Sequence, residues 1–147
     1  MTPISQNDHR LPDQVQKAGC LFRSLSMLAE IQARRTLEPA QIVEQYHWLI
    51  KNSHMDGHCY VLDHAAVIRS AQYYLGTQQR AEYVLRRTET GLNDFDKGTP
   101  NAWIGHVKTE AGHGHFLVIA SDGRVIWDPW WPSPTPVKTL SLRGYRT

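Results

Sequence analysis

The chain has 147 residues, of which 41% are hydrophobic and 20% are charged, a composition typical of a folded globular protein rather than a disordered one. The formal net charge at pH 7 is only +2, and no run of lysines or arginines forms a basic patch, so we expect no nucleic-acid partner. No stretch approaches the roughly 20 apolar residues that a membrane span needs, so we expect no membrane partner either.

The length predicts one domain over residues 1–147. Residues 1–13 are polar and contain two prolines, which indicates a flexible arm. This beginning also lacks the apolar segment of a signal peptide, which predicts a cytoplasmic protein, with a leaderless secreted effector or a phage protein as alternatives.

Three helices are predicted in the first half of the chain. The first covers residues 20–35, where apolar side chains recur every three or four residues. The second follows a cap at residues 36–38 and has Pro39 in its first turn. The third covers residues 63–75, between a capping aspartate and a terminating glycine.

The pattern then changes to short β-rich runs at residues 81–87, 102–108, 115–121 and 124–128. "SDGR" joins the last two as a tight hairpin, because Asp-Gly tolerates the positive φ of such turns. The proline-rich tail from Pro129 onward is expected to be extended and to pack at an edge. Helices followed by antiparallel strands predict the α+β class, with N-terminal helices packed on a C-terminal sheet.

Cys20 stands at the start of the first predicted helix, directly after a glycine. His115 and Asp128 lie about seven and five residues from the hairpin turn, so they should be cross-strand or diagonal neighbours. If the helix start packs against that end of the hairpin, thiol, imidazole and carboxylate line up. A helix N-terminus and a neighbouring imidazolium favour a thiolate, which can attack a carbonyl carbon. The Cys20 backbone N–H and an upstream glutamine could stabilise the oxyanion.

Other interpretations stay open at this point. Cys20 could be a small core residue, and His113 could replace His115 as the base. The same histidines with Asp128 and Cys20 could bind zinc, although no CxxC or HExxH motif accompanies them. Cys20 and Cys59 could also form a disulfide, but without an export signal we expect both to stay reduced.

The order of these motifs resembles the papain-like cysteine peptidase superfamily, in particular its small bacterial C39-like branch. The resemblance covers roughly residues 14–130 and is carried by an upstream Gln, "GC" at a helix start, "GHFLVI" and "WDP". It implies a papain-like fold with Cys20 as nucleophile, His115 as base and Asp128 as the residue that orients the imidazole.

The resemblance also implies an oxyanion glutamine six residues before the cysteine, which is Gln14, while Gln16 stands nearby in "QKAGC". Both stay candidates. Trp127 and Trp130, on either side of "DP", and the neighbouring His113 are expected to wall the substrate cleft.

The function expected from these residues is hydrolysis of a peptide or isopeptide amide in a peptide or protein substrate, through an acyl-thioester on Cys20. No metal or other cofactor is expected. A peptidoglycan amidase or a transglutaminase-like acyl transferase would use the same triad. A catalytically inactive papain-like binding or effector module is the alternative from another class, and a zinc hydrolase is the third. The oligomeric state stays open.

Overall fold

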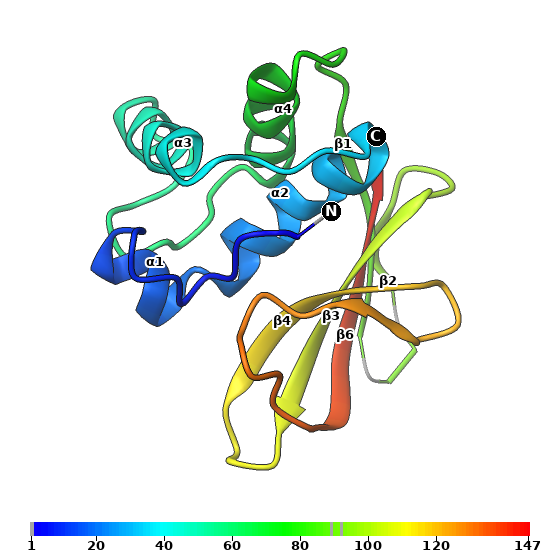
Figure 1. The fold of residues 1–147 in the computed structure, drawn as a ribbon. Coiled ribbons are helices and arrows are strands. Elements are labelled where there is room, and N and C mark those ends of the chain that lie inside the picture. The colour runs from blue at the N-terminus through cyan, green and yellow to red at the C-terminus, as the bar shows by residue number, and fades with distance from the viewer. Residues whose placement is uncertain (1, 89, 92) are drawn as a thin grey trace.

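The computed structural model of the protein describes residues 2–88, 90–91 and 93–147. These residues form four helices followed by a six-stranded antiparallel sheet, so the fold is a mixed α+β one (Figure 1). The helices are α1 (Asp13–Ala18), α2 (Cys20–Ala33), α3 (Pro39–Lys51) and α4 (His64–Leu75). The strands are β1 (Glu82–Thr88), β2 (Asn93–Asp96), β3 (Ala102–Thr109), β4 (Gly114–Ile119), β5 (Val125–Trp127) and β6 (Pro136–Arg146).

The three predicted helices are confirmed, because their end signals act as the sequence indicates. Glu38 and Gln41 form a reciprocal capping box at the start of α3. The Asp63 side chain accepts the backbone N–H of Ala66 at the start of α4. Gly76 ends α4 in the left-handed region, with φ of +70°.

The N-terminal segment differs from the expected flexible arm. It is irregular up to residue 12, but Gln6 and Leu11 are buried. The Gln6 backbone N–H donates to the carbonyl oxygen of Pro129 at 2.7 Å, and the Asn7 side-chain amide donates to the carbonyl oxygen of Trp131. We call residues 2–7 the N-terminal strap. The short helix α1 follows it and was not predicted.

The sheet has the strand order β2-β1-β6-β3-β4-β5, with every neighbouring pair antiparallel. The predicted hairpin at residues 121–124 is confirmed as the β4–β5 connection, with Gly123 at φ of +89°. The prediction that the tail packs at an edge is wrong, because β6 lies between β1 and β3. The prolines end at Pro136, and the residues after it can donate N–H groups to both neighbours.

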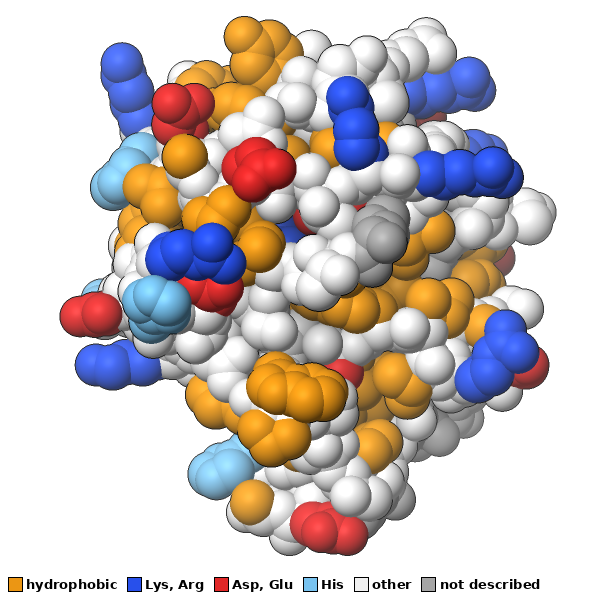
Figure 2. All heavy atoms as spheres, in the orientation of Figure 1, with side chains coloured by type: hydrophobic (Ala, Val, Ile, Leu, Met, Phe, Trp, Pro, Cys, Tyr) orange, Lys and Arg blue, Asp and Glu red, His pale blue; other side chains and the backbone are white. Residues whose placement is uncertain are grey.

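The main core lies between one face of the sheet and the helices. Helix α2 contacts α4 on one side and strands β3 and β4 on the other (Figure 1). Its middle is buried, including Phe22, Leu25 and Met27. On the face of the molecule in Figure 2, charged side chains are scattered among hydrophobic and uncharged ones. None of the helices formed by the described residues has the length and apolar character that crossing a membrane requires.

Candidate active site

Cys20 is the first residue of α2, and the chain reaches it through a close turn at Gly19. The Gly19 backbone N–H donates to the carbonyl oxygen of Val15 at 2.8 Å, which joins α1 to α2. A Cβ atom at position 19 would lie 2.5 Å from that same oxygen, so only glycine fits there. The thiol of Cys20 is free and partly exposed. The helix start therefore holds a reactive group at a site that favours negative charge.

His115 and Asp128 form the hydrogen bond that the hairpin geometry predicts. The distance from His115 Nε2 to Asp128 Oδ1 is 2.7 Å, and both side chains are at least nine-tenths buried. The same carboxylate oxygen accepts the backbone N–H of Trp130 at 2.9 Å. These two donors fix the carboxylate, and the carboxylate fixes the imidazole ring.

The thiol of Cys20 and the imidazole of His115 line the same pocket. Because Nε2 of His115 is bonded to Asp128, Nδ1 is the ring nitrogen left to face Cys20, whose negative charge contributes to the raised pKa of His115. The Ser24 hydroxyl, one turn along α2, donates to the carbonyl oxygen of Phe116, the residue after His115, at 3.3 Å. Helix α2 is thus attached to β4 beside the reacting pair.

The electrostatics of this pair favour a protonated imidazole. Burial lowers the pKa of His115, but the hydrogen bonds and negative charges of Asp128 and Cys20 outweigh it and raise the pKa to about 9. A pKa above 7 keeps the imidazolium form at neutral pH, and an imidazolium beside Cys20 stabilises a thiolate. The arrangement can therefore support a thiolate–imidazolium pair.

The structure brings neither predicted oxyanion glutamine to the thiol. Gln16 donates its side-chain amide to the carbonyl oxygen of Leu11 at 2.8 Å, and Gln14 does not line the pocket around Cys20. Gln6, in the N-terminal strap, lines that pocket and is 2% exposed. Its side-chain nitrogen donates one N–H to the carbonyl oxygen of Gln16 at 3.4 Å, which leaves its second N–H available.

The pocket around Cys20 and His115 has a volume of about 480 Å³, and we call it the catalytic pocket. Its lining includes two of the three predicted cleft residues, His113 and Trp130. Trp127 is not part of that lining. Its ring instead packs against the main core, with the Arg23 guanidinium carbon 5.8 Å from the ring centroid. Lys17, at the end of α1, also lines the pocket and was not predicted.

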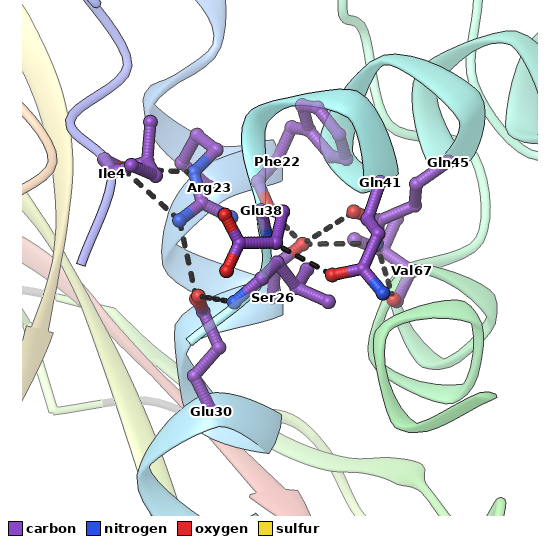
Figure 3. A network of polar contacts seen from close by, with 10 residues as sticks. Ile4, Phe22, Arg23, Ser26, Glu30, Glu38, Gln41, Gln45 and Val67 are labelled. Carbon is purple, nitrogen blue, oxygen red and sulfur yellow. Dashed lines mark hydrogen bonds and ion pairs between the residues drawn. The ribbon is translucent and has the colours of Figure 1, made fainter. Parts of the chain in front are cut away.

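A buried ion pair on α2 lies close to the site. Arg23 and Glu30 on α2 are fully buried, and Arg23 Nη2 lies 3.2 Å from Glu30 Oε2 (Figure 3). Arg23 also donates to the carbonyl oxygen of Ile4, at 3.0 Å from Nη2. Arg23 therefore attaches the N-terminal strap to α2, and its guanidinium packs against the ring of Trp127, the residue before Asp128.

The other cysteine lies in a different setting. Cys59 is 5% exposed and forms no disulfide with Cys20. Burial raises the pKa of the Cys59 thiol to about 12, and the negative charges of Asp56 and Cys20 add to the shift. Cys59 is therefore an inert internal reference for Cys20. In the part of the chain that the structure describes, no group of three His, Cys, Asp or Glu side chains has the arrangement of a metal site.

Comparison with known protein families gives a match over nearly the whole chain. The family described as "Protein of unknown function, DUF261" matches residues 1–146, so the chain belongs to this family. The comparisons with curated proteins and with solved structures found no match.

Proposed function

We propose that this member of a family of unknown function is a papain-like cysteine hydrolase that cleaves an amide bond of a peptide or protein. One observation carries the proposal. A thiol at a helix N-terminus and an imidazole line one pocket, and a buried carboxylate is hydrogen-bonded to Nε2 of that imidazole. This is the set of groups that thiol-dependent acyl transfer needs.

In the first half of the proposed reaction, the Cys20 thiolate attacks the carbonyl carbon of the substrate amide. The electron pair of the C=O double bond moves to oxygen, which becomes an oxyanion. The second N–H of the Gln6 side chain and the backbone N–H of Cys20 are the donors for this charge. The tetrahedral intermediate then expels the amine. His115 gives its Nδ1 proton to the leaving nitrogen, and an acyl-thioester remains on Cys20.

In the second half, the now neutral His115 accepts a proton from water at Nδ1. The resulting hydroxide adds to the thioester carbon, and the C–S bond breaks to release the carboxylic acid and the Cys20 thiolate. Asp128 holds the ring in place throughout and stabilises the imidazolium form. His115 ends the cycle protonated, as it began, with the proton taken from water in place of the one given to the amine.

The first test is the rate at which iodoacetamide alkylates Cys20 and Cys59, measured by mass spectrometry from pH 4 to 9. We expect Cys20 to react well below pH 7, with little change in rate between pH 5 and 7. In His115→Ala, the rate should rise with pH as it does for a free thiol. Equal, slow reaction of both cysteines in the native chain would overturn the proposal, since Cys20 would then be an ordinary core residue.

The second test separates an enzyme from an inactive module of the same fold. p-Nitrophenyl acetate acylates reactive thiols, so native protein should form an acetyl adduct on Cys20 and release more than one p-nitrophenol per chain. Cys20→Ser removes the thiolate and serves as the matched control. Formation of the adduct without further turnover would contradict hydrolysis, because the second half-reaction would be missing.

A further inference from the structure

A row of polar side chains lies on the face of the sheet that looks toward the helices. Ser141 of β6 pairs with His106 of β3, which pairs with Phe116 of β4. Two residues further along β6, Arg143 pairs with Ile104. Directly paired residues share a face, and Phe116 and Ile104 both pack on the main core. We call Ser141, Arg143 and His106 the polar row.

The polar row leads to the catalytic pocket. The next residue of β4 on this face is Gly114, which lines that pocket. A Cβ atom at Gly114 would lie 3.0 Å from His106 Nε2, so the imidazole of His106 reaches the pocket's edge. Burial lowers the pKa of His106, and the positive charges of Arg143, Arg86 and His115 lower it further. The polar row therefore meets the catalytic pocket where His106 approaches Gly114.

Among the residues that the structure describes, Arg143 has no acid partner, unlike Arg23 with Glu30. Its guanidinium carbon lies 4.7 Å from the centroid of the Phe116 ring, and among the described residues it makes no ion pair. Its Nε and Nη1 atoms are buried without a hydrogen-bond acceptor in the described part of the chain. A buried donor without an acceptor is costly, so this guanidinium is suited to an acceptor from outside the chain.

Ser141 gives a second, independent sign of a missing partner. The residue is 4% exposed, and its hydroxyl oxygen has no hydrogen-bond partner among the residues that the structure describes. It lies on the same strand and face as Arg143, two residues away. A hydroxyl and a guanidinium with unsatisfied buried atoms thus lie on one strand face, next to the imidazole that approaches the catalytic pocket.

We propose that the polar row binds a carboxylate group of the substrate, so that the enzyme prefers acidic peptides. This inference rests on the proposed function, because the row borders the same pocket. Arg143 supplies a formal positive charge, which attracts the negative charge of a carboxylate. The planar guanidinium can hold both carboxylate oxygens, and Ser141 and neutral His106 can each donate one more hydrogen bond.

The experiment uses reagents that report on Cys20 without a known substrate. Bromoacetyl-dipeptide amides carry a neutral reacting group, and the Cys20 sulfur displaces bromide from it. Paired reagents with Glu or Gln at the first or second position differ only in charge. We expect the better Glu reagent to alkylate Cys20 about tenfold faster than its Gln partner, as a hydrogen bond between charged groups would give.

Arg143→Gln should abolish this preference, and Arg143→Lys should keep part of it, because lysine keeps the charge but loses the planar fork. The matched control is Arg87→Gln. Arg87 also lies over an aromatic ring, since its guanidinium carbon is 5.9 Å from the centroid of the Trp103 ring. It does not pair with Arg143, because the residue of β1 that does so is Arg86. Arg87→Gln should keep the full preference. No acid in the described part of the chain pairs with Arg143, so its variants should fold, which a thermal scan checks.

The outcomes separate the two proposals. Equal, fast reaction of Cys20 with Glu and Gln reagents would overturn the carboxylate site and leave the proposed hydrolase intact. Slow reaction with every reagent, unaffected by His115→Ala, would overturn both. A phosphoserine reagent that outpaces the Glu reagent would overturn the assignment to a carboxylate. A Glu preference that survives Arg143→Gln would place the anion site elsewhere and overturn the role of the polar row.

Discussion

The backbone N–H of Gln6 donates to the carbonyl oxygen of Pro129 at 2.7 Å, which ties the N-terminal strap to the residue that follows Asp128. Asn7 strengthens this connection, because its side-chain amide donates to the carbonyl oxygen of Trp131 at 2.6 Å. One contact therefore places two groups of the candidate site. The strap brings the Gln6 amide to the catalytic pocket, and the same contact holds the loop whose carboxylate orients His115.

Gln6→Ala should slow acylation of Cys20 without slowing its alkylation. Ester attack by a thiolate passes through an oxyanion, whereas displacement of iodide from iodoacetamide does not. Loss of one oxyanion donor costs about 10²–10³ in rate in other enzymes. We therefore expect a fall of about this size in the p-nitrophenol burst rate, and an alkylation rate within about twofold of the native one.

Two variants at neighbouring positions control for indirect effects. Gln14→Ala and Gln16→Ala remove the glutamines that the sequence suggested, and neither should reproduce the split between acylation and alkylation. If Gln6→Ala slowed both reactions equally, Gln6 would act by holding the strap in place rather than by contacting the oxyanion.

Local rules in the sequence were sufficient to predict Cys20 at a helix start and His115 beside Asp128. The meeting of Cys20 with His115 depends on the packing of α2 against β4, which the sequence left as a condition. Helix periodicity sets the helix start at Cys20, and the Asp-Gly turn sets the register that puts His115 near Asp128. These are short-range signals. The three predicted helices and the hairpin are reproduced for the same reason.

The parts that were missed depend on contacts between distant segments. Gln6 reaches the pocket through a strap held by Pro129, and no local pattern in the first 13 residues encodes that pairing. The central place of β6 depends on pairing with β1 and β3 at once. Its prolines suggested an edge, but they precede the strand or, in the case of Pro136, occupy its first position. The signal available was the alternation in "LSLRGYR", which is typical of a strand with two different faces.

Gly19→Ala should destabilise the protein and impair Cys20. The added Cβ would lie 2.5 Å from the Val15 carbonyl oxygen, a backbone atom that cannot move alone. We expect a loss of about 1–3 kcal/mol in unfolding free energy, as for other overpacked positions, and slower Cys20 alkylation because the start of α2 must shift. Urea unfolding measures the first effect. Gly57→Ala is the control, since nothing lies within 4 Å of its added Cβ; an equal loss there would show that steric contact is not the cause.

The stability contributed by His115 should depend on pH in a defined direction. Its pKa is raised from 6.5 to about 9 in the folded state, so protonation favours folding. The contribution is complete below about pH 6.5, the unfolded pKa, and is lost as the pH rises through about 9. We expect the difference in thermal midpoint between native protein and His115→Ala to shrink across this window. A difference that instead grew with pH would mean that folding favours the neutral imidazole.

Asp128→Asn offers a sharper version of this measurement. The neutral amide removes one of the groups that raise the pKa of His115, so the NMR titration midpoint of His115 should fall below its native value. Asparagine has nearly the same shape as aspartate, and its side-chain oxygen can still accept a hydrogen bond. An unchanged midpoint would show that the carboxylate does not set the protonation of His115.

Arg23→Met should be the most destabilising of these substitutions. It leaves the Glu30 carboxylate buried without its cation and the Ile4 carbonyl without its donor. Breaking one side of a buried ion pair typically costs about 3–5 kcal/mol, and we expect a loss of that size in urea unfolding. Because Arg23 also holds the strap that carries Gln6, the acylation rate of the folded fraction should fall more than its alkylation rate.

The double variant Arg23→Met/Glu30→Met separates the effect of an unpaired buried charge from the effect of losing the contact that holds the strap. Removing both charges relieves the uncompensated carboxylate, so stability should recover by several kcal/mol relative to the single variant. The strap would still lack its anchor at Ile4, and acylation should stay slow even where stability returns. If acylation recovered together with stability, Arg23 would support the fold alone, and the attachment of the strap to α2 would have no part in the chemistry at Cys20.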